Sequence, residues 1–147
     1  GTNAKLQELN CSIGLRQLRG FKKRLRHRQS TLAYYKKNLV PLGYTFQEND
    51  ELSTVAFVST LAPSQSIARR TYDALLDGGI EVKRYYMPLH SQAIFKNKTV
   101  IAGDLINTDY VASSIISLPL HDSMELGIID LISTIIKKSL GWNGQHE

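Results

Sequence analysis

The chain has 147 residues, a formal net charge of +5 and 42% hydrophobic residues, which fits one soluble domain and excludes wholesale disorder. No apolar run approaches the roughly 20 residues that a bilayer-spanning helix needs, and no His/Cys spacing indicates a metal site, so we expect none. The single cysteine, Cys11, cannot form an internal disulfide. The first residues are polar and do not resemble a signal peptide. We therefore expect a cytoplasmic protein.

Residues 4–39 have the apolar periodicity of one long helix, or of two nearly continuous ones. The main apolar stripe consists of Leu18, Phe21, Leu25, Leu32, Tyr35 and Leu39, and an earlier one of Leu6, Leu9 and Ile13. The two stripes are out of phase, which predicts a bend near Gly14 and Gly20. The segment from Pro41 to Gly43 ends the run. A straight helix of this length would span roughly 50 Å, so we expect it to connect two bodies or to pack on a partner chain.

The rest of the chain alternates between strand-like and helix-like segments. The expected strands are residues 54–60, 80–86 and 115–120; the expected helices are 64–76, 107–114 and 124–140, with residues 87–103 as a loop. Ser64 and Ser123 are the expected N-caps of the first and last of these helices. The pattern predicts an α/β fold, with helices packed on a sheet. We divide the chain into a helical entry segment, 1–42, an α/β body, 43–141, and a tail, 142–147.

A dense run of basic residues lies between Arg16 and Arg28. Clustered positive charge can attract the phosphates of a nucleic acid, but it is also typical of the solvated face of an amphipathic helix. The solvated face is favoured, because an apolar stripe continues through the run and no base-stacking aromatics are interleaved with it. Arg28 falls on the apolar stripe, so we expect a carboxylate to pair with it.

Two short segments carry the candidate chemistry. Residues 1–5 place Asn3 and Lys5 at a helix start, where backbone N–H groups and the helix dipole favour an anion; Asn3 could equally be a simple N-cap. Residues 84–90 combine a cation, two phenols and an imidazole at a strand-to-loop transition, which suits a sugar or a diphosphate. The same residues could instead form a partly buried aromatic cluster with a surface histidine.

Two further residues have ordinary interpretations. Cys11 lies in the middle of the predicted first helix, where a small buried thiol is the common state. His121 follows a predicted strand end, where contact with its neighbours or capping of the next helix is the expected role.

Three segments, in order, resemble the DegT/DnrJ/EryC1/StrS sugar aminotransferases. GTNAKLQEL (1–9) with IGLRQL (13–18) is similar to the helix that follows the cofactor lysine of that family. YYMPLH (85–90) resembles its tyrosine-rich Pro-Leu-His turn, and SLPLH (117–121) resembles its late strand end. The resemblance implies the connecting helix and C-terminal small domain of a fold-type I aminotransferase, a scaffold of dimers that share active sites.

The same resemblance implies site residues. Asn3 would reach the pyridoxal 5'-phosphate of the partner subunit, and Lys5 would help to hold the substrate's diphosphate. Tyr85, Tyr86 and His90 would line the nucleotide-sugar site. The implied reaction transfers an amino group, usually from glutamate, to a nucleotide-linked keto-sugar, as in polysaccharide biosynthesis.

The chain departs from the family pattern in one decisive respect. Leu6, Gln7 and the pair Cys11-Ser12 are mild departures, but no lysine occupies the family's cofactor position. Together with the start at Gly1 inside a predicted helix, this leads us to expect a fragment that is inactive alone. Two alternatives remain: a stand-alone basic module that binds nucleic acid or a partner protein, and a degenerate paralogue retained for subunit association.

Overall fold

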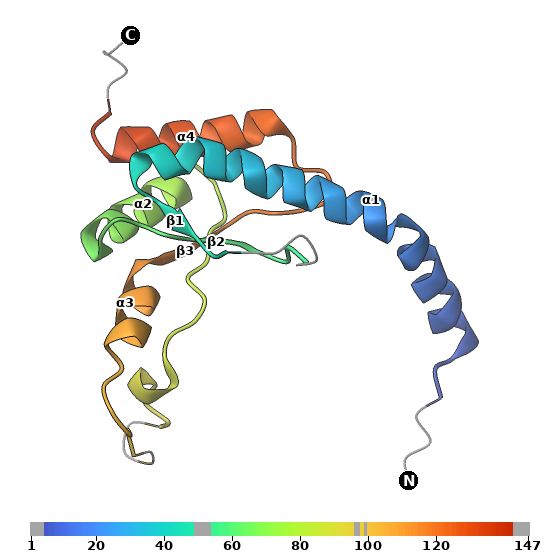
Figure 1. Ribbon diagram of the computed structural model, residues 1–147, viewed down its shortest axis with the longest axis horizontal. Helices are drawn as coiled ribbons and strands as arrows, with labels where there is room; N and C mark the ends of the chain where they lie inside the picture. The colour runs from blue at the N-terminus through green and yellow to red at the C-terminus, as the bar shows by residue number, and fades with distance from the viewer. Residues whose placement is uncertain (1–4, 49–53, 96–97, 99, 143–147) are drawn as a thin grey trace.

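The computed structural model describes residues 5–48, 54–95, 98 and 100–142, in which one long helix crosses a small sheet (Figure 1). In chain order the elements are α1 (Glu8–Leu39), η1 (Val40–Leu42), β1 (Thr45–Phe46), β2 (Val58–Leu61), α2 (Gln65–Asp77), η2 (Leu89–Ser91), α3 (Ile106–Ser114), β3 (Ile115–Leu118) and α4 (Leu126–Ser139). The four α-helices lie close to where the sequence predicts them. Ser64 is confirmed as the N-cap of α2, since its Oγ accepts a hydrogen bond from the Ile67 N–H at 3.3 Å.

The sheet is antiparallel, in the order β1-β2-β3. Val58 and Thr60 of β2 are buried, whereas Ser59 and Leu61 between them are half-buried. This alternation follows from the two-residue period of a strand. Helices α1, α2 and α4 lie on one side of the sheet, and α3 projects from the other side (Figure 1). One face of the sheet is therefore much less covered than the other.

The C-terminal half of α1 belongs to the hydrophobic core. Leu32, Tyr35 and Leu39 are buried in one cluster with Val58 of β2 and Ile132 of α4. The Tyr35 hydroxyl donates a hydrogen bond to the backbone carbonyl of Pro119 at 3.1 Å. The apolar stripe predicted for this part of the helix is thus confirmed as a core-facing stripe.

The N-terminal half of α1 leaves the body of the molecule and stays exposed. Leu9 and Leu18 are 70% and 68% exposed. The helix changes direction in this half (Figure 1), as the out-of-phase stripes predicted. Near the bend the Arg24 guanidinium lies over Gly20, where a Cβ atom would collide with it, and donates to the Gln17 carbonyl at 2.6 Å. A side chain that bonds to the helix backbone in this way is a recognised cause of bending.

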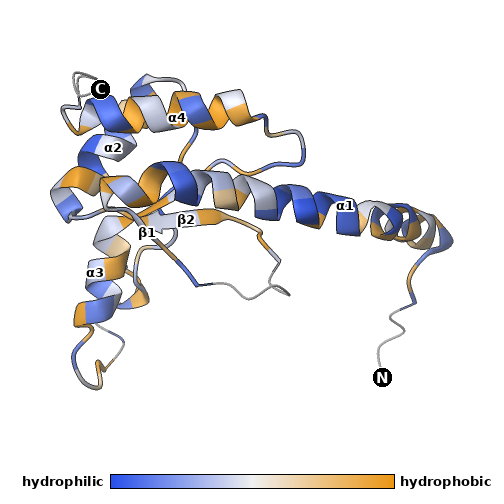
Figure 2. Ribbon diagram, turned by 45° about the horizontal axis from the view of Figure 1, so that its top comes forward, coloured by the Kyte–Doolittle hydropathy of each residue, from blue (hydrophilic) through white to orange (hydrophobic). Residues whose placement is uncertain are grey.

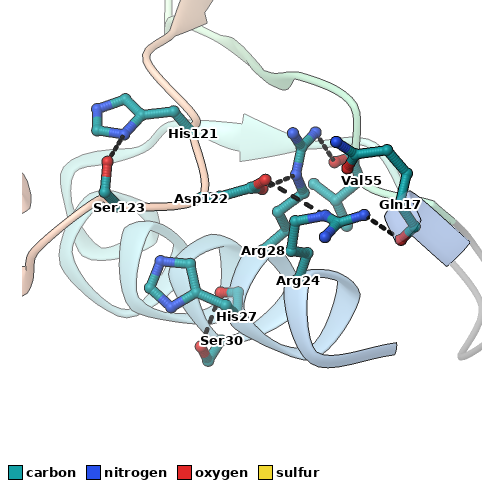
Figure 3. Close-up of polar contacts among 9 residues, drawn as sticks. All are labelled: Gln17, Arg24, His27, Arg28, Ser30, Val55, His121, Asp122 and Ser123. Atoms are coloured by element: carbon teal, nitrogen blue, oxygen red, sulfur yellow. Dashed lines mark hydrogen bonds and ion pairs between the residues drawn. The ribbon is translucent and has the colours of Figure 1, made fainter. Parts of the chain in front are cut away.

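Two arginines on one acid fasten α1 to the loop after β3 (Figure 3). The Arg28 Nε lies 2.9 Å from one Asp122 carboxylate oxygen, and the Arg24 Nε lies 3.5 Å from the other. Arg28 also donates to the Val55 carbonyl at 3.3 Å. The expected pairing of Arg28 with a carboxylate is confirmed, and we call these three side chains the Asp122 clamp.

The expected strand at residues 80–86 is wrong. Only Lys83 joins the ladder, through an isolated bridge to Ser117. Pro119 has no N–H, so β3 cannot extend the ladder beyond Leu118. After the bridge the chain turns toward α3, to which Arg84 donates hydrogen bonds.

Three smaller expectations also need correction. Strand β2 begins at Val58, because residues 54–57, which lead into it, make no ladder pairing, and the two-residue strand β1 was not foreseen. Glu125, not Ser123, is the N-cap of α4; the Ser123 hydroxyl lies 3.2 Å from His121 Nδ1, so His121 contacts its neighbour. Cys11, expected to be buried, is exposed, because the described residues leave this half of α1 uncovered.

Candidate functional site

The segment that follows Lys83 is held against α3. The Arg84 guanidinium donates to the backbone carbonyls of Ala112, at 3.4 Å, and of Ser113 at the C-terminal end of α3. These carbonyls have no partner within the helix, and the helix dipole favours a cation there. Arg84 thus fixes the direction in which the chain enters Tyr85 and Tyr86.

An open hollow of about 380 Å³ lies between this segment and α3. It is lined by Tyr85, Tyr86 and Pro88 on one side and by Asn107, Thr108, Val111 and Ala112 of α3 on the other. We call it the tyrosine hollow. The two tyrosine rings lie 4.7 Å apart between centroids, and Phe57 meets Tyr85 edge-on at 5.6 Å. Tyr86 is 75% exposed, so its ring is open to a ligand.

His90 sits beside the tyrosine hollow and pairs with an acid of α3. Its Nε2 lies 2.9 Å from the Asp109 carboxylate, and the side chains of His90 and Asp109 are 21% and 60% exposed. The contact ties the short η2 turn to the first turn of α3. Tyr85, Tyr86 and His90, predicted from the sequence as substrate residues, are therefore brought into one region.

Sequence reasoning missed the contribution of α3. Asn107 and Thr108 line the tyrosine hollow, and Asp109 orients His90. The available signal was a cluster of polar residues in the first turn of a predicted helix, but nothing in the sequence placed that turn beside residue 90. The juxtaposition arises from the fold.

The other predicted site segment lies elsewhere. Lys5 is exposed and precedes α1, whose N-terminal end lies on the opposite side of the molecule from α3 (Figures 1 and 2). Asn3 lies outside the described residues. One copy of the chain therefore does not bring Lys5 to the tyrosine hollow.

The described residues do not fit pyridoxal phosphate. A lysine that forms a Schiff base needs a neutral amine, which burial or a neighbouring cation supplies by lowering its pKa. No lysine lines the tyrosine hollow, and Lys83, the nearest in sequence, is exposed and lies 2.9 Å from Glu81. The hydrogen bond to Glu81 raises the pKa of the Lys83 amine, which keeps it charged.

The part of the chain that the structure describes contains neither a cluster of metal ligands nor a membrane-spanning helix. Its His, Cys, Asp and Glu side chains do not gather in any group of three or more that could hold an ion. Among its helices, none combines the length and apolarity that crossing a bilayer requires.

Comparison with known proteins agrees with the resemblance of the three sequence segments. Protein Rv3402c of Mycobacterium tuberculosis is 34% identical over 127 residues, covering 84% of this chain and 31% of that protein. The dTDP-4-amino-4,6-dideoxy-D-glucose transaminase of Shigella dysenteriae is 25% identical over 145 residues, covering 94% of this chain and 39% of that enzyme. The chain thus spans about a third of the length of the curated relatives that it matches.

Solved structures show the same fold. A PLP-dependent aminotransferase structure from Bacillus cereus superposes with a TM-score of 0.78 and 26% identity, over 92% of this chain and 38% of that one. A DegT DnrJ EryC1 StrS aminotransferase from Brucella abortus gives a TM-score of 0.75 over 99% of this chain. The fold is therefore that of part of a fold-type I aminotransferase, as predicted. The model of the DegT/DnrJ/EryC1/StrS aminotransferase family matches residues 1–137, and the chain belongs to that family.

Proposed function

We propose that this chain is the C-terminal portion of a pyridoxal-phosphate-dependent sugar aminotransferase. The observation that carries the proposal is a family match over residues 1–137 in a chain that spans only 31–39% of its curated relatives. Residues 1–42 would be the connecting helix, 43–141 the small domain and 142–147 a tail. The intact enzyme would transfer an amino group from glutamate to a nucleotide-linked keto-sugar.

The names of the relatives support this substrate class. The Shigella relative is a dTDP-linked amino-sugar transaminase, and a Campylobacter jejuni relative, 23% identical, is a UDP-linked one. In such an enzyme the cofactor supplies the electron sink for amino transfer, and the protein binds and orients the substrate. In our proposal Tyr85, Tyr86 and His90 do this from the small domain.

The position of Lys5 supports a shared site. Lys5 precedes α1, whose N-terminal end lies far from α3 (Figure 1), and α3 lines the tyrosine hollow. A single copy therefore cannot use both on one substrate molecule. A symmetric dimer can bring distant segments of two copies together. We therefore propose a cytoplasmic homodimer in which Asn3 and Lys5 reach the cofactor phosphate and the substrate diphosphate of the neighbouring subunit.

Two uncovered apolar surfaces support the proposal that a further domain packs on this chain. The N-terminal half of α1 exposes leucines, and the poorly covered sheet face carries a second hollow of about 280 Å³. Phe46, Leu61, Val111 and Ile115 contribute its apolar lining. Apolar surfaces of this kind mark sites of packing or ligand binding. We propose that the large domain of the intact enzyme covers them.

Glutamate-dependent formation of 2-oxoglutarate tests the proposal. The purified 147-residue chain, supplied with pyridoxal phosphate and a nucleotide-linked keto-sugar, is expected to form none. In a chimera, the part of the Shigella transaminase that precedes the matched region is fused to residue 1 of this chain. This chimera is expected to form 2-oxoglutarate. Turnover by the 147-residue chain would contradict the proposed need for a lysine outside it, and a folded, dimeric, inactive chimera would contradict the proposed enzyme.

The nucleic-acid alternative is less well supported by the geometry. Arg24 and Arg28 are already engaged with Asp122, and the middle of α1 is hydrophilic while the core-facing stripe continues beyond it (Figure 2). Binding of duplex DNA that weakens steeply with salt would indicate phosphate contacts. We expect only weak binding without sequence preference.

A further inference from the structure

We propose that one side of α1 binds the surface of an anionic lipid membrane. The binding surface consists of five cations in about three turns of the helix, which we call the basic row: Arg16, Arg19, Lys22, Lys23 and Arg26. The contact is peripheral, because no described helix has the length and apolarity to cross a bilayer. Membrane binding goes beyond the proposed amino transfer and does not rest on it, so either can fail alone.

Helix α1 holds the excess positive charge of the chain. It contains nine of the 18 lysines and arginines but, with Glu8, only one of the 13 acids. The formal charge of α1 is therefore +8, whereas the other residues of the chain, with nine cations and 12 acids, sum to −3. An anionic surface would attract α1 before any other part of this chain.

The basic row is exposed and makes no ion pair with another described residue. All five of its members are exposed, and the ion pairs between described residues involve other cations. Arg24, next to Lys23, shows the contrast, because it is half-buried and its Nε lies 3.5 Å from the Asp122 carboxylate. An anion outside the chain can therefore meet the basic row without breaking an ion pair within it.

The basic row faces away from the core of the molecule. Arg19, Lys22 and Arg26 follow one another at intervals of three and four residues, the spacing of neighbours on a helix surface. At about 100° and 1.5 Å per residue, the row extends over about 15 Å, on the side of the helix opposite the buried Tyr35 and Leu39. Figure 2 shows a hydrophilic middle of α1 where the helix leaves the sheet. A further domain that packed on the core-facing side would leave the basic row outward.

An exposed leucine among these cations favours a lipid surface over a nucleic acid. Leu15 precedes Arg19 by four residues and Lys22 by seven, so it lies on their side of the helix, and it is 60% exposed. Lipid headgroups offer anionic groups directly above hydrocarbon, which cations and a leucine can contact together. The outside of a duplex offers phosphates but no hydrocarbon layer for the leucine. Groups of about four to eight lysines and arginines on a helix are typical of binding to anionic lipid.

Co-sedimentation of the 147-residue chain with lipid vesicles tests the proposal. One set of vesicles contains phosphatidylcholine and phosphatidylserine, and the other contains phosphatidylcholine alone. At low salt the chain is expected to bind the phosphatidylserine vesicles at least about tenfold more tightly than the neutral ones. This preference should disappear at about 1 M salt, which shortens the screening length to about 3 Å. Equal binding to both vesicles at low salt, or binding to neither, would overturn the proposal.

A triple variant locates the binding surface on the helix. Arg19→Gln, Lys22→Gln and Arg26→Gln together remove three positive charges, while glutamine keeps a helix propensity similar to that of lysine and arginine. Binding to the phosphatidylserine vesicles should weaken on the order of 100-fold, since each cation close to the surface contributes about fivefold. Circular dichroism checks that the variant stays as helical as the wild type.

Three exposed cations outside α1 provide the charge-matched control. Arg69→Gln, Arg70→Gln and Lys138→Gln remove the same net charge from α2 and α4. This second triple variant should weaken binding by less than about fivefold, because its cations do not belong to the basic row. Equal losses in the two triple variants would mean general charge attraction and would overturn the assignment to α1.

Duplex DNA is the competing occupant of the basic row. DNA added to the vesicle-bound chain, at an equal concentration of negative charge, is expected to leave most of the chain on the vesicles. If DNA instead removes the chain, and the Arg19, Lys22 and Arg26 variant fails to bind that DNA, the row is a nucleic-acid surface and the lipid proposal is wrong.

Discussion

The two halves of α1 carry apolar stripes of similar composition, but only one half is buried. Leu32, Tyr35 and Leu39 are buried against β2 and α4, whereas Leu9 and Leu18 lie in the open. Helical periodicity shows which face of a helix needs cover, but the cover itself depends on what else the chain folds around it. The C-terminal half finds that cover within this chain, and the N-terminal half does not.

The Asp122 clamp marks the boundary between the two halves. Arg24 and Arg28 hold α1 to the loop after β3 (Figure 3). On the N-terminal side of Arg24 the helix bends away from the body of the molecule (Figure 1). The tyrosine hollow lies on the other side of the sheet, with α3. The described part of the chain therefore has two separate uncovered regions, as our proposal of a larger enzyme requires.

The most direct test of this difference is to truncate one leucine in each half of α1. Leu39→Ala empties a fully buried site and should lower the free energy of unfolding by about 3 kcal/mol. Leu18→Ala is its matched control on the exposed half and should change it by less than about 0.5 kcal/mol. Urea unfolding followed by circular dichroism measures both. Similar losses would mean that the N-terminal half is covered as well.

The hydroxyl of Tyr35 provides a second test of the buried half of α1. Tyr35→Phe removes the hydrogen bond to the Pro119 carbonyl and should cost about 1 kcal/mol of unfolding free energy at neutral pH. Burial raises the pKa of the Tyr35 phenol above its usual 10.0. A raised folded-state pKa gives stability that is fully present below the unfolded pKa and is lost as pH rises above it.

The raised pKa of Tyr35 predicts how the stability of the two proteins changes with pH. Between about pH 9 and about pH 11, the wild-type chain should lose more unfolding free energy than Tyr35→Phe, because only the wild type gains by ionising this phenol on unfolding. Urea midpoints at the two pH values give the comparison. Parallel losses in both proteins would show that Tyr35 is not shielded from water.

The Asp122 clamp should have the smallest of these effects. Asp122→Ala should cost at most about 1 kcal/mol, because both arginines and the acid are partly exposed and water screens them. Asp104→Ala removes the same charge from an exposed acid that has no ion pair with any other described residue, and it serves as the control. The difference between the two variants should shrink in high salt, and a difference that persists unchanged would contradict an electrostatic clamp.

The sequence predicted the helices better than the sheet, for physical reasons. Helices α1 and α2 have an apolar period and local end signals, Pro41 after α1 and Ser64 before α2. Strand β1 has only two residues, and residues 80–86 contain only one that pairs with β3. Strand pairing depends on distant partners, which short apolar runs do not specify.

The candidate site shows the same division. Tyr85, Tyr86 and His90 were found because they share one short segment. Asp109 was not found as the partner of His90, and Asp122 was not found as the partner of Arg28, because each contact joins segments far apart in the chain. The position of Arg28 on the apolar stripe predicted that it pairs with an acid, but only the fold identifies which acid.

Hydrogen exchange along α1, read by mass spectrometry on the 147-residue chain, tests the central comparison most directly. We predict slow exchange in residues 31–39, where opening exposes the core, and fast exchange in residues 8–21, where few tertiary contacts hold the helix. Equal and strong protection along the whole of α1 would contradict the account. It would mean that the chain covers its own N-terminal helix and needs no further body to complete it.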